Sequence, residues 1–145
     1  MSAGVSNAGR GLYTPEVLAA AMELAAFPWR DDLPYTGTAR SRSCGSTLDL
    51  ALETDATGAI TALGLRPHAC AIGQAAAAQF VRGAKGQTRA AIAQARASLA
   101  LWLAGDGAQP DWPGLALLDP ARAYPARHGA ILLAWDAALA ALPTD

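Results

Sequence analysis

The order of apolar and polar positions predicts that the chain begins with an amphipathic helix. A helix is predicted over residues 13–27, because Thr14 can cap its start and Pro15 suits its first helical position. Its apolar side is predicted to consist of Val17, Leu18, Met22, Leu24 and Ala25. The segment "PWRDDLP" then interrupts the helical pattern, so the next element is expected to start after it.

Residues 35–66 have the pattern of β structure. Strict alternation over residues 47–53 predicts a strand with Leu48, Leu50 and Leu52 on one face and Thr47, Asp49 and Glu53 on the other. The turn "TDATG" favours a positive φ at Gly58 and leads into a second strand over residues 59–66. Residues 35–43 can supply a preceding strand. Together these segments predict a small antiparallel meander.

The remainder of the chain has a helical pattern. Helices are predicted over residues 70–83, 87–107 and 126–143, with glycines at Gly83 and Gly105 ending the first two. The inward-facing residues of the second and third helices are expected to be Ile92, Ala95, Leu99, Trp102 and Leu103, and Ile131, Leu132, Trp135, Leu139 and Leu142. Proline-rich residues 106–125 are predicted to be an irregular link.

The predicted order of elements is a helix, three strands and then helices. It indicates an α+β fold with two layers, in which a small three-stranded antiparallel sheet is packed by about four to five helices. The length of 145 residues suits a single domain over residues 1–145.

Composition and charge exclude several classes of protein. Hydrophobic residues make up 52% of the chain and charged residues 16%, which argues against disorder. A net charge of −1 without a basic stripe gives no sign of a nucleic-acid or membrane-surface partner. The apolar segments are too short to span a membrane, and no secretion signal is recognised. Two cysteines do not form a disulfide framework, so we expect reduced thiols in a cytoplasm.

The two cysteines are the best candidates for chemistry. Cys70 lies where a predicted strand gives way to a helix, a position at which amide groups and the helix dipole favour a thiolate. Cys44 is placed at the start of a strand, near the positive charges of Arg40 and Arg42. A buried structural role is the alternative for either cysteine alone. Two thiolates are an incomplete metal site, because zinc and iron–sulfur centres usually need four ligands.

The two histidines are weaker candidates. His68 and His128 are the only imidazoles in the chain, and a lone histidine is more often a surface or hydrogen-bonded residue. His128 is the better candidate ligand of the two, because it begins the last predicted helix. The segment "RGAKGQT" lacks the spacing of a phosphate-binding loop, and no Ser-His-Asp arrangement stands out.

The order and spacing of these motifs resemble the iron–sulfur cluster assembly scaffolds, the IscU, SufU and NifU N-terminal group. The residues that carry the resemblance are "YTPEVLAAAMELAAFP", "SCGSTLDLALETDATGAITALGLRPHACAI", "FVRGAKG" and "RHGAILLAWDAALAAL". The form "LAW" in the last segment and the long insert after Gly83 are similar to the SufU-like branch. The resemblance covers most of the chain and implies a SufE/NifU-like fold.

The resemblance also implies a site. In that family three cysteines and an aspartate hold a nascent cluster or a zinc ion. Cys44 and Cys70 match the first two cysteines, whereas the aspartate position is Ser46 and the third cysteine position is Ala130. His128 lies one residue away from a histidine position of the IscU branch. The implied metal ligands are therefore Cys44, Cys70 and His128, with an iron–sulfur cluster of the 2Fe–2S type, or a zinc or iron ion, as cofactor.

The function implied is that of a divergent, non-enzymatic scaffold-like protein of a bacterial cytoplasm. It would bind iron or a 2Fe–2S cluster through Cys44 and Cys70, receive sulfur from a cysteine desulfurase and work with other assembly proteins. Loss of the ligands at Ser46 and Ala130 leaves two alternatives open. One is a degenerate scaffold that acts as a binding or regulatory module of the assembly machinery. The other is a thiol or persulfide carrier that acts through Cys70.

Overall fold

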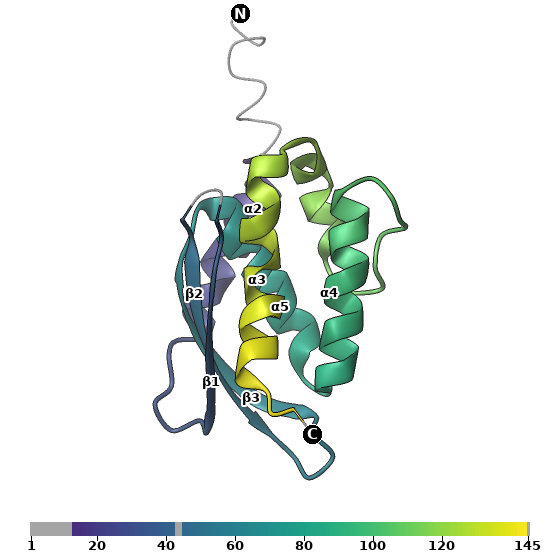
Figure 1. Ribbon diagram of the computed structural model, residues 1–145. Coiled ribbons are helices and arrows are strands. Elements are labelled where there is room, and N and C mark those ends of the chain that lie inside the picture. Colours follow the sequence, from purple (N-terminus) through teal and green to yellow (C-terminus); the bar gives the residue numbers. More distant parts are fainter. Residues whose placement is uncertain (1–12, 43–44, 145) are drawn as a thin grey trace, which may run out of the picture.

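The computed structural model describes residues 13–42 and 45–144 (Figure 1). Within these ranges a helical segment comes first, then three strands, then further helices, as the sequence pattern predicts. In chain order the elements are α2 (Pro15–Met22), the 3-10 turn η1 (Glu23–Ala26), β1 (Tyr35–Arg40), β2 (Thr47–Thr54), β3 (Ile60–His68), α3 (Ala71–Ala84), α4 (Arg89–Leu103), the 3-10 segments η2 (Leu115–Ala123) and η3 (Pro125–Arg127), and α5 (His128–Ala141).

The sheet has the order β1-β2-β3, and both strand pairs are antiparallel. Its register pairs Leu50 with Leu65 and Asp49 with Arg66, so apolar side chains collect on one face and polar side chains on the other. Leu48, Leu50 and Leu52 are fully buried, as their alternation in the sequence predicts. The α+β class and the antiparallel meander are confirmed.

Helices cover the apolar face of the sheet. Helix α5 lies along β1 and β2, α4 packs on the far side of α5, and α2 packs on α3 (Figure 1). The close approach of α5 to the sheet depends on Gly37 in β1. A Cβ atom at this position would lie 2.5 Å from the carbonyl oxygen of Ala137 and 2.5 Å from the amide nitrogen of Ala141. Within the described ranges, no helix is both long and apolar enough to cross a membrane.

The first helix differs from its predicted form. Val17, Ala20 and Leu24 face the core, whereas Leu18 is 47% exposed and Met22 is 78% exposed. The small side chain of Ala20 lies on the buried stripe, which lets α2 approach α3 closely. The prediction that Leu18, Met22 and Ala25 face inward is therefore wrong.

The proline-rich link is more ordered than predicted. Its residues Leu115–Ala123 form 3-10 turns, where the sequence indicated irregular structure. Trp112 fixes the preceding part of the link to α3: its Nε1 donates to the carbonyl of Gln79 at 2.7 Å, and its ring stacks on Phe80 at a centroid distance of 5.7 Å. Gly83 makes room for this indole, because a Cβ there would lie 2.6 Å from the Trp112 ring.

Candidate functional site

Cys70 lies between the end of β3 and the first residue of α3. It is the N-cap of α3, with extended backbone angles (φ −65°, ψ 169°), and its carbonyl accepts the first helical hydrogen bond from the amide of Gln74 at 2.9 Å. No side chain caps this helix start in the described part of the chain. The thiol is free and half-buried, and one side of it packs against the core. The predicted helix start at Cys70 is confirmed.

The thiol lies in a shallow open depression of about 530 Å³. Two segments distant in sequence form it, because β2 and β3 are antiparallel and Thr47 pairs with His68. Gly45 and Ser46, just before β2, therefore line the same depression as Ala69 and Cys70, just after β3. The turn between β1 and β2 is closed by hydrogen bonds between the Ser41 amide and the Ser46 carbonyl (2.8 Å) and between the Gly45 amide and the Ser41 carbonyl (3.0 Å).

Three further polar side chains line this depression. Gln74 is held by a hydrogen bond from its side-chain amide to the carbonyl of Ala69 at 2.8 Å. Arg127 reaches it from the start of α5, and His68 from the end of β3. The sequence pattern did not single out Arg127 because its link to Cys70 is purely spatial. Its place immediately before the last helix was the available signal.

His128 is held elsewhere. It begins α5, as predicted, but its Nε2 lies 3.2 Å from the carbonyl oxygen of Ala121 and 3.1 Å from that of Arg122. Two acceptors facing Nε2 place the ring proton on that nitrogen, which leaves Nδ1 as the nitrogen that could bind a metal. His128 is not among the residues that line the depression at Cys70, whereas His68 is.

The two positions at which the sequence resemblance implies a missing aspartate and a missing cysteine lie beside this region. Ser46 lines the depression and is buried. Ala130 is 1% exposed and lies against the first turn of α3, where a Cβ built on Gly73 would be 3.3 Å from its own Cβ. Both positions thus lie close to the start of α3, and their side chains are a hydroxyl and a methyl group.

Cys44 lies outside the described residues, so the predicted approach of its sulfur to that of Cys70 stays a prediction. Across residues 13–42 and 45–144, no three histidine, cysteine, aspartate or glutamate side chains gather as a metal-binding group. The donor set of these ranges therefore does not fit a closed four-ligand site. A metal site built on Cys70 would need further ligands than these ranges gather around it.

Comparison with known proteins identifies solved structures with a similar fold but no matching sequence family. No family model matches the chain. A search of curated proteins finds no match either. Solved structures do match, over almost the whole chain.

A NifU-like protein (N-terminal) from Brucella abortus is 27% identical, with a TM-score of 0.80, over 91% of this chain and 92% of that chain. A protein assigned as an iron–sulfur cluster assembly scaffold for the SUF system of Fervidobacterium islandicum AW-1 is 20% identical. Its TM-score is 0.75, over 92% of this chain and 98% of that one. The fold is thus that of NifU-like and SufU proteins, and the resemblance inferred from the sequence is confirmed in structure.

Proposed function

We propose that this chain takes part in iron–sulfur cluster assembly as a non-enzymatic, scaffold-like protein. The observation that carries this proposal is the match to the NifU-like structure, with a TM-score of 0.80 and 27% identity over nine-tenths of both chains. The free thiol of Cys70, at the open start of α3, supplies a chemical group suited to that role. The cargo held there would be iron, sulfur or a 2Fe–2S cluster.

The surroundings of Cys70 suit a negatively charged cargo. The first amide groups of α3 and the positive end of its dipole favour negative charge at the N-cap. Arg127 adds a cationic group to the same depression. The second thiol of the proposed site is Cys44, which directly precedes Gly45, a residue that lines the depression. His128 could join only through Nδ1, since Nε2 faces two carbonyls.

The incomplete ligand set means that a cluster bound here would need ligands from outside this chain. Ser46 and Ala130 offer neither a carboxylate nor a thiol, so the remaining ligands of a cluster would come from a second copy of the chain, a small thiol or a partner in the assembly machinery. A cluster held by so few protein ligands would be easily passed on. The partners proposed are a cysteine desulfurase and other assembly proteins.

A second candidate function needs only one cysteine. In the described ranges Cys70 is a solitary thiol, which is sufficient for a sulfur carrier. The Cys70 thiolate would attack the outer sulfur of a persulfide on a desulfurase. One S–S bond forms on Cys70 as the donor S–S bond breaks, and the donor cysteine leaves as a thiolate. The steps balance without an added oxidant or reductant.

Anaerobic reconstitution with iron and sulfide tests the first function. Visible absorption and iron content would be measured for the wild type, Cys70→Ser, Cys44→Ser and Arg127→Gln. We expect cluster absorption in the wild type and its loss in both cysteine variants. Arg127→Gln should retain less cluster than the wild type. Arg82→Gln is the matched control, because Arg82 pairs with Glu23 away from this depression.

The same set of variants separates the two functions. A sulfur carrier would accept sulfur from a persulfide donor in the wild type and in Cys44→Ser, but not in Cys70→Ser, and would hold no iron. A wild-type chain that takes up neither iron nor sulfur would overturn both functions.

A further inference from the structure

The two outer strands of the sheet differ in how far other segments pair with their outer edges. On β3, the amide of Leu65 donates to the carbonyl of Phe27 at 3.1 Å, and Ile60 forms backbone hydrogen bonds with Gln87 (3.0 Å) and Gly86 (2.8 Å). On β1, the other outer strand (Figure 1), no backbone hydrogen bond joins the described residues to any segment except β2. The outer edge of β1 is therefore available for pairing.

The register identifies the backbone groups that point outward from β1. Opposite residues of an antiparallel pair alternate between those that exchange hydrogen bonds and those that do not. The amide of Ser41 donates to the carbonyl of Ser46 where β1 turns into β2, so every second residue before Ser41 bonds β2. The amides and carbonyls of the residues between them, Thr36, Thr38 and Arg40, therefore point away from β2.

This edge lacks most of the features that prevent strand addition. Protected edge strands commonly carry prolines, several charges or a β-bulge. The pairing of β1 with β2 is uninterrupted over six residues, which include no proline and one charged residue, Arg40. On the inner side of the sheet, Tyr35 and Ala39 are half-buried against the core, so an added strand would have apolar neighbours there.

The end of β1 that leads into the β1–β2 turn is positively charged. Arg40 and Arg42 are exposed, and neither forms an ion pair in the part of the chain that the structure describes. Residues 1–12 and 43–44 contain no aspartate or glutamate that could pair with them. Asp49 on the neighbouring strand is already ion-paired with another arginine. Acidic residues on an added segment would complement this end of the edge.

A second copy of the chain fits this edge poorly. Helix α5 passes so close to Gly37 that a Cβ atom there would lie 2.5 Å from the helix backbone. Two copies paired through β1 would place two such helices above strands about 4.8 Å apart, whereas packed helices lie about 8–10 Å apart. A single extended segment brings no such helix.

We propose that the outer edge of β1 binds an extended segment of a partner protein, which adds as an antiparallel fourth strand with acidic residues beside Arg40 and Arg42. Its apolar side chains would face the inner side of the sheet, and small polar side chains would lie opposite Thr36 and Thr38. The segment would begin beside the turn that borders the Cys70 depression. This inference goes beyond the proposed function and does not depend on cargo at Cys70.

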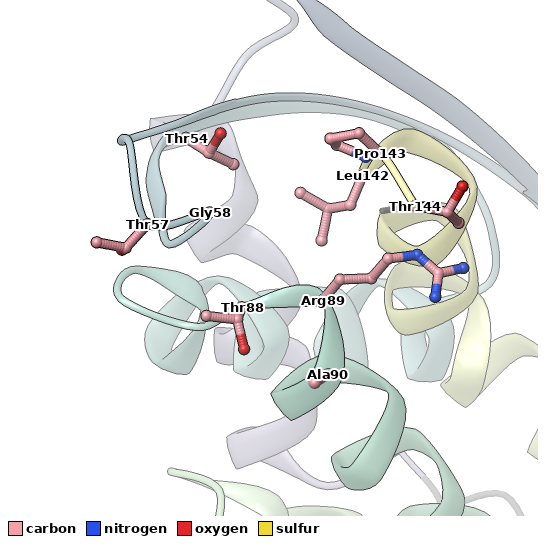
Figure 2. A pocket seen from close by; sticks show the side chains of 9 residues that line it. All are labelled: Thr54, Thr57, Gly58, Thr88, Arg89, Ala90, Leu142, Pro143 and Thr144. Carbon is pink, nitrogen blue, oxygen red and sulfur yellow. The ribbon is translucent and has the colours of Figure 1, made fainter.

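The blocked peptide acetyl-Asp-Ser-Asp-Val-Thr-Val-Thr-Val-amide is a suitable probe. It would be titrated into the full chain at low ionic strength and followed by amide chemical shifts and hydrogen exchange. We expect saturable shifts and slower exchange at Thr36, Thr38 and Arg40. The cavity at the far end of β2, which Figure 2 shows with Thr88 and Leu142 among its walls, should show no shifts and serves as internal reference.

Methylation of peptide amides separates strand addition from unspecific binding. In the proposed register the amides of the two peptide threonines face β1, whereas those of the first two valines face away from it. Methyl groups on the threonine amides should abolish saturation, and methyl groups on the valine amides should leave binding intact.

Substitutions in the chain test the same edge. Thr36→Pro removes an outward amide that does not bond β2, so the variant should fold and bind the peptide at least about tenfold more weakly. Thr36→Ala keeps this amide and should bind as the wild type does. The double variant Arg40→Gln/Arg42→Gln should bind about fivefold more weakly, a difference that high salt removes. Arg82→Gln is the control for loss of an arginine.

Four results would overturn the proposal. The first is an absence of saturation with the unmodified peptide. The second is equal binding of the peptide methylated on its threonines, a test that stands even where Thr36→Pro does not fold. The third is equal affinity of the wild type and folded Thr36→Pro. The fourth is a dimer of the wild type that Thr36→Pro does not form, which would assign the edge to a second copy.

Discussion

The position of Cys70 at the start of a helix and beside a cationic side chain makes its thiol a candidate binding group. Cys70 is the N-cap residue of a 14-residue helix whose start no described side chain caps, and it lines a depression shared with Arg127. Ala130 is the nearby position at which the resemblance described from the sequence implies a third cysteine, and this chain has a methyl group there. The buried contact between Ala130 and Gly73 keeps this position close to the first turn of α3.

Ala130→Cys should therefore increase the amount of iron retained after anaerobic reconstitution. The substitution adds a sulfur beside the first turn of α3, at a cost of about 1–3 kcal/mol in the free energy of unfolding, because it enlarges a side chain in a packed contact. Iron per chain and visible absorption measure the gain. Ala134→Cys, one turn further along α5 and equally buried, is the matched control. An equal gain in both variants would contradict the placement of a ligand position at Ala130.

At the scale of elements, the contact between α5 and the sheet positions Ala130 and Arg127. This contact is close because Gly37 offers no side chain to the backbone of α5. The alternation of leucines in β2 was sufficient to predict which face of the sheet is buried. The crossing of α5 over β1 was not predictable, because it depends on a glycine whose partners are about 100 residues away in sequence.

Gly37→Ala should destabilise the fold by about 3 kcal/mol or more, since backbone atoms 2.5 Å from the new Cβ cannot move without shifting α5. Urea unfolding would measure the change. Thr36→Ala, the neighbouring exposed position on β1, should change the free energy of unfolding by no more than about 0.5 kcal/mol. Equal stability of Gly37→Ala and Thr36→Ala would show that α5 does not pack this closely on the sheet.

The outer face of the sheet makes the stability of the fold depend on pH. A hydrogen bond from Thr38 (2.7 Å), followed by the hydrogen bond and charge of Arg66 and the charge of His68, lowers the pKa of Asp49 from 3.8. A carboxyl group with a lowered pKa in the folded state stabilises the fold above its unfolded pKa, and this contribution is lost as the pH falls through the folded value.

Asp49→Asn should therefore be less stable than the wild type near pH 7, with a difference that shrinks progressively once the pH falls below 3.8. Urea unfolding at several pH values would follow this difference. Asp106→Asn, at an exposed position after α4, serves as the control for removal of one negative charge. A difference between wild type and Asp49→Asn that stays constant down to acidic pH would contradict this role of Asp49.

For the molecule as a whole, the sequence was most informative about the layers and least about the links. The order of elements, the meander and the helix start at Cys70 followed from alternation, turn residues and small-residue patterns. The inward face of α2 was wrongly predicted at Leu18 and Met22, since burial there is decided by packing against α3. The anchoring of the link by Trp112 depends on a carbonyl of Gln79 and on space left by Gly83, neither of which has a local signature.

The candidate site was only partly predictable for the same reason. Cys70 could be singled out because it stands at a boundary between predicted elements. Arg127 and His68 join its depression through the pairing of β2 with β3 and the packing of α5, which single-sequence patterns do not reveal. His128 could be placed at the start of the last helix, but the two carbonyls that face its Nε2 lie in a link that was predicted to be irregular.

Native mass spectrometry of the chain isolated without exposure to oxygen would show whether Cys70 holds such cargo. The wild type should carry additional iron and sulfur, or sulfur alone, and Cys70→Ser should carry neither. If wild type and Cys70→Ser, from cells that actively assemble iron–sulfur clusters, each showed only the mass calculated from its own sequence, a role for Cys70 in holding such cargo would be contradicted.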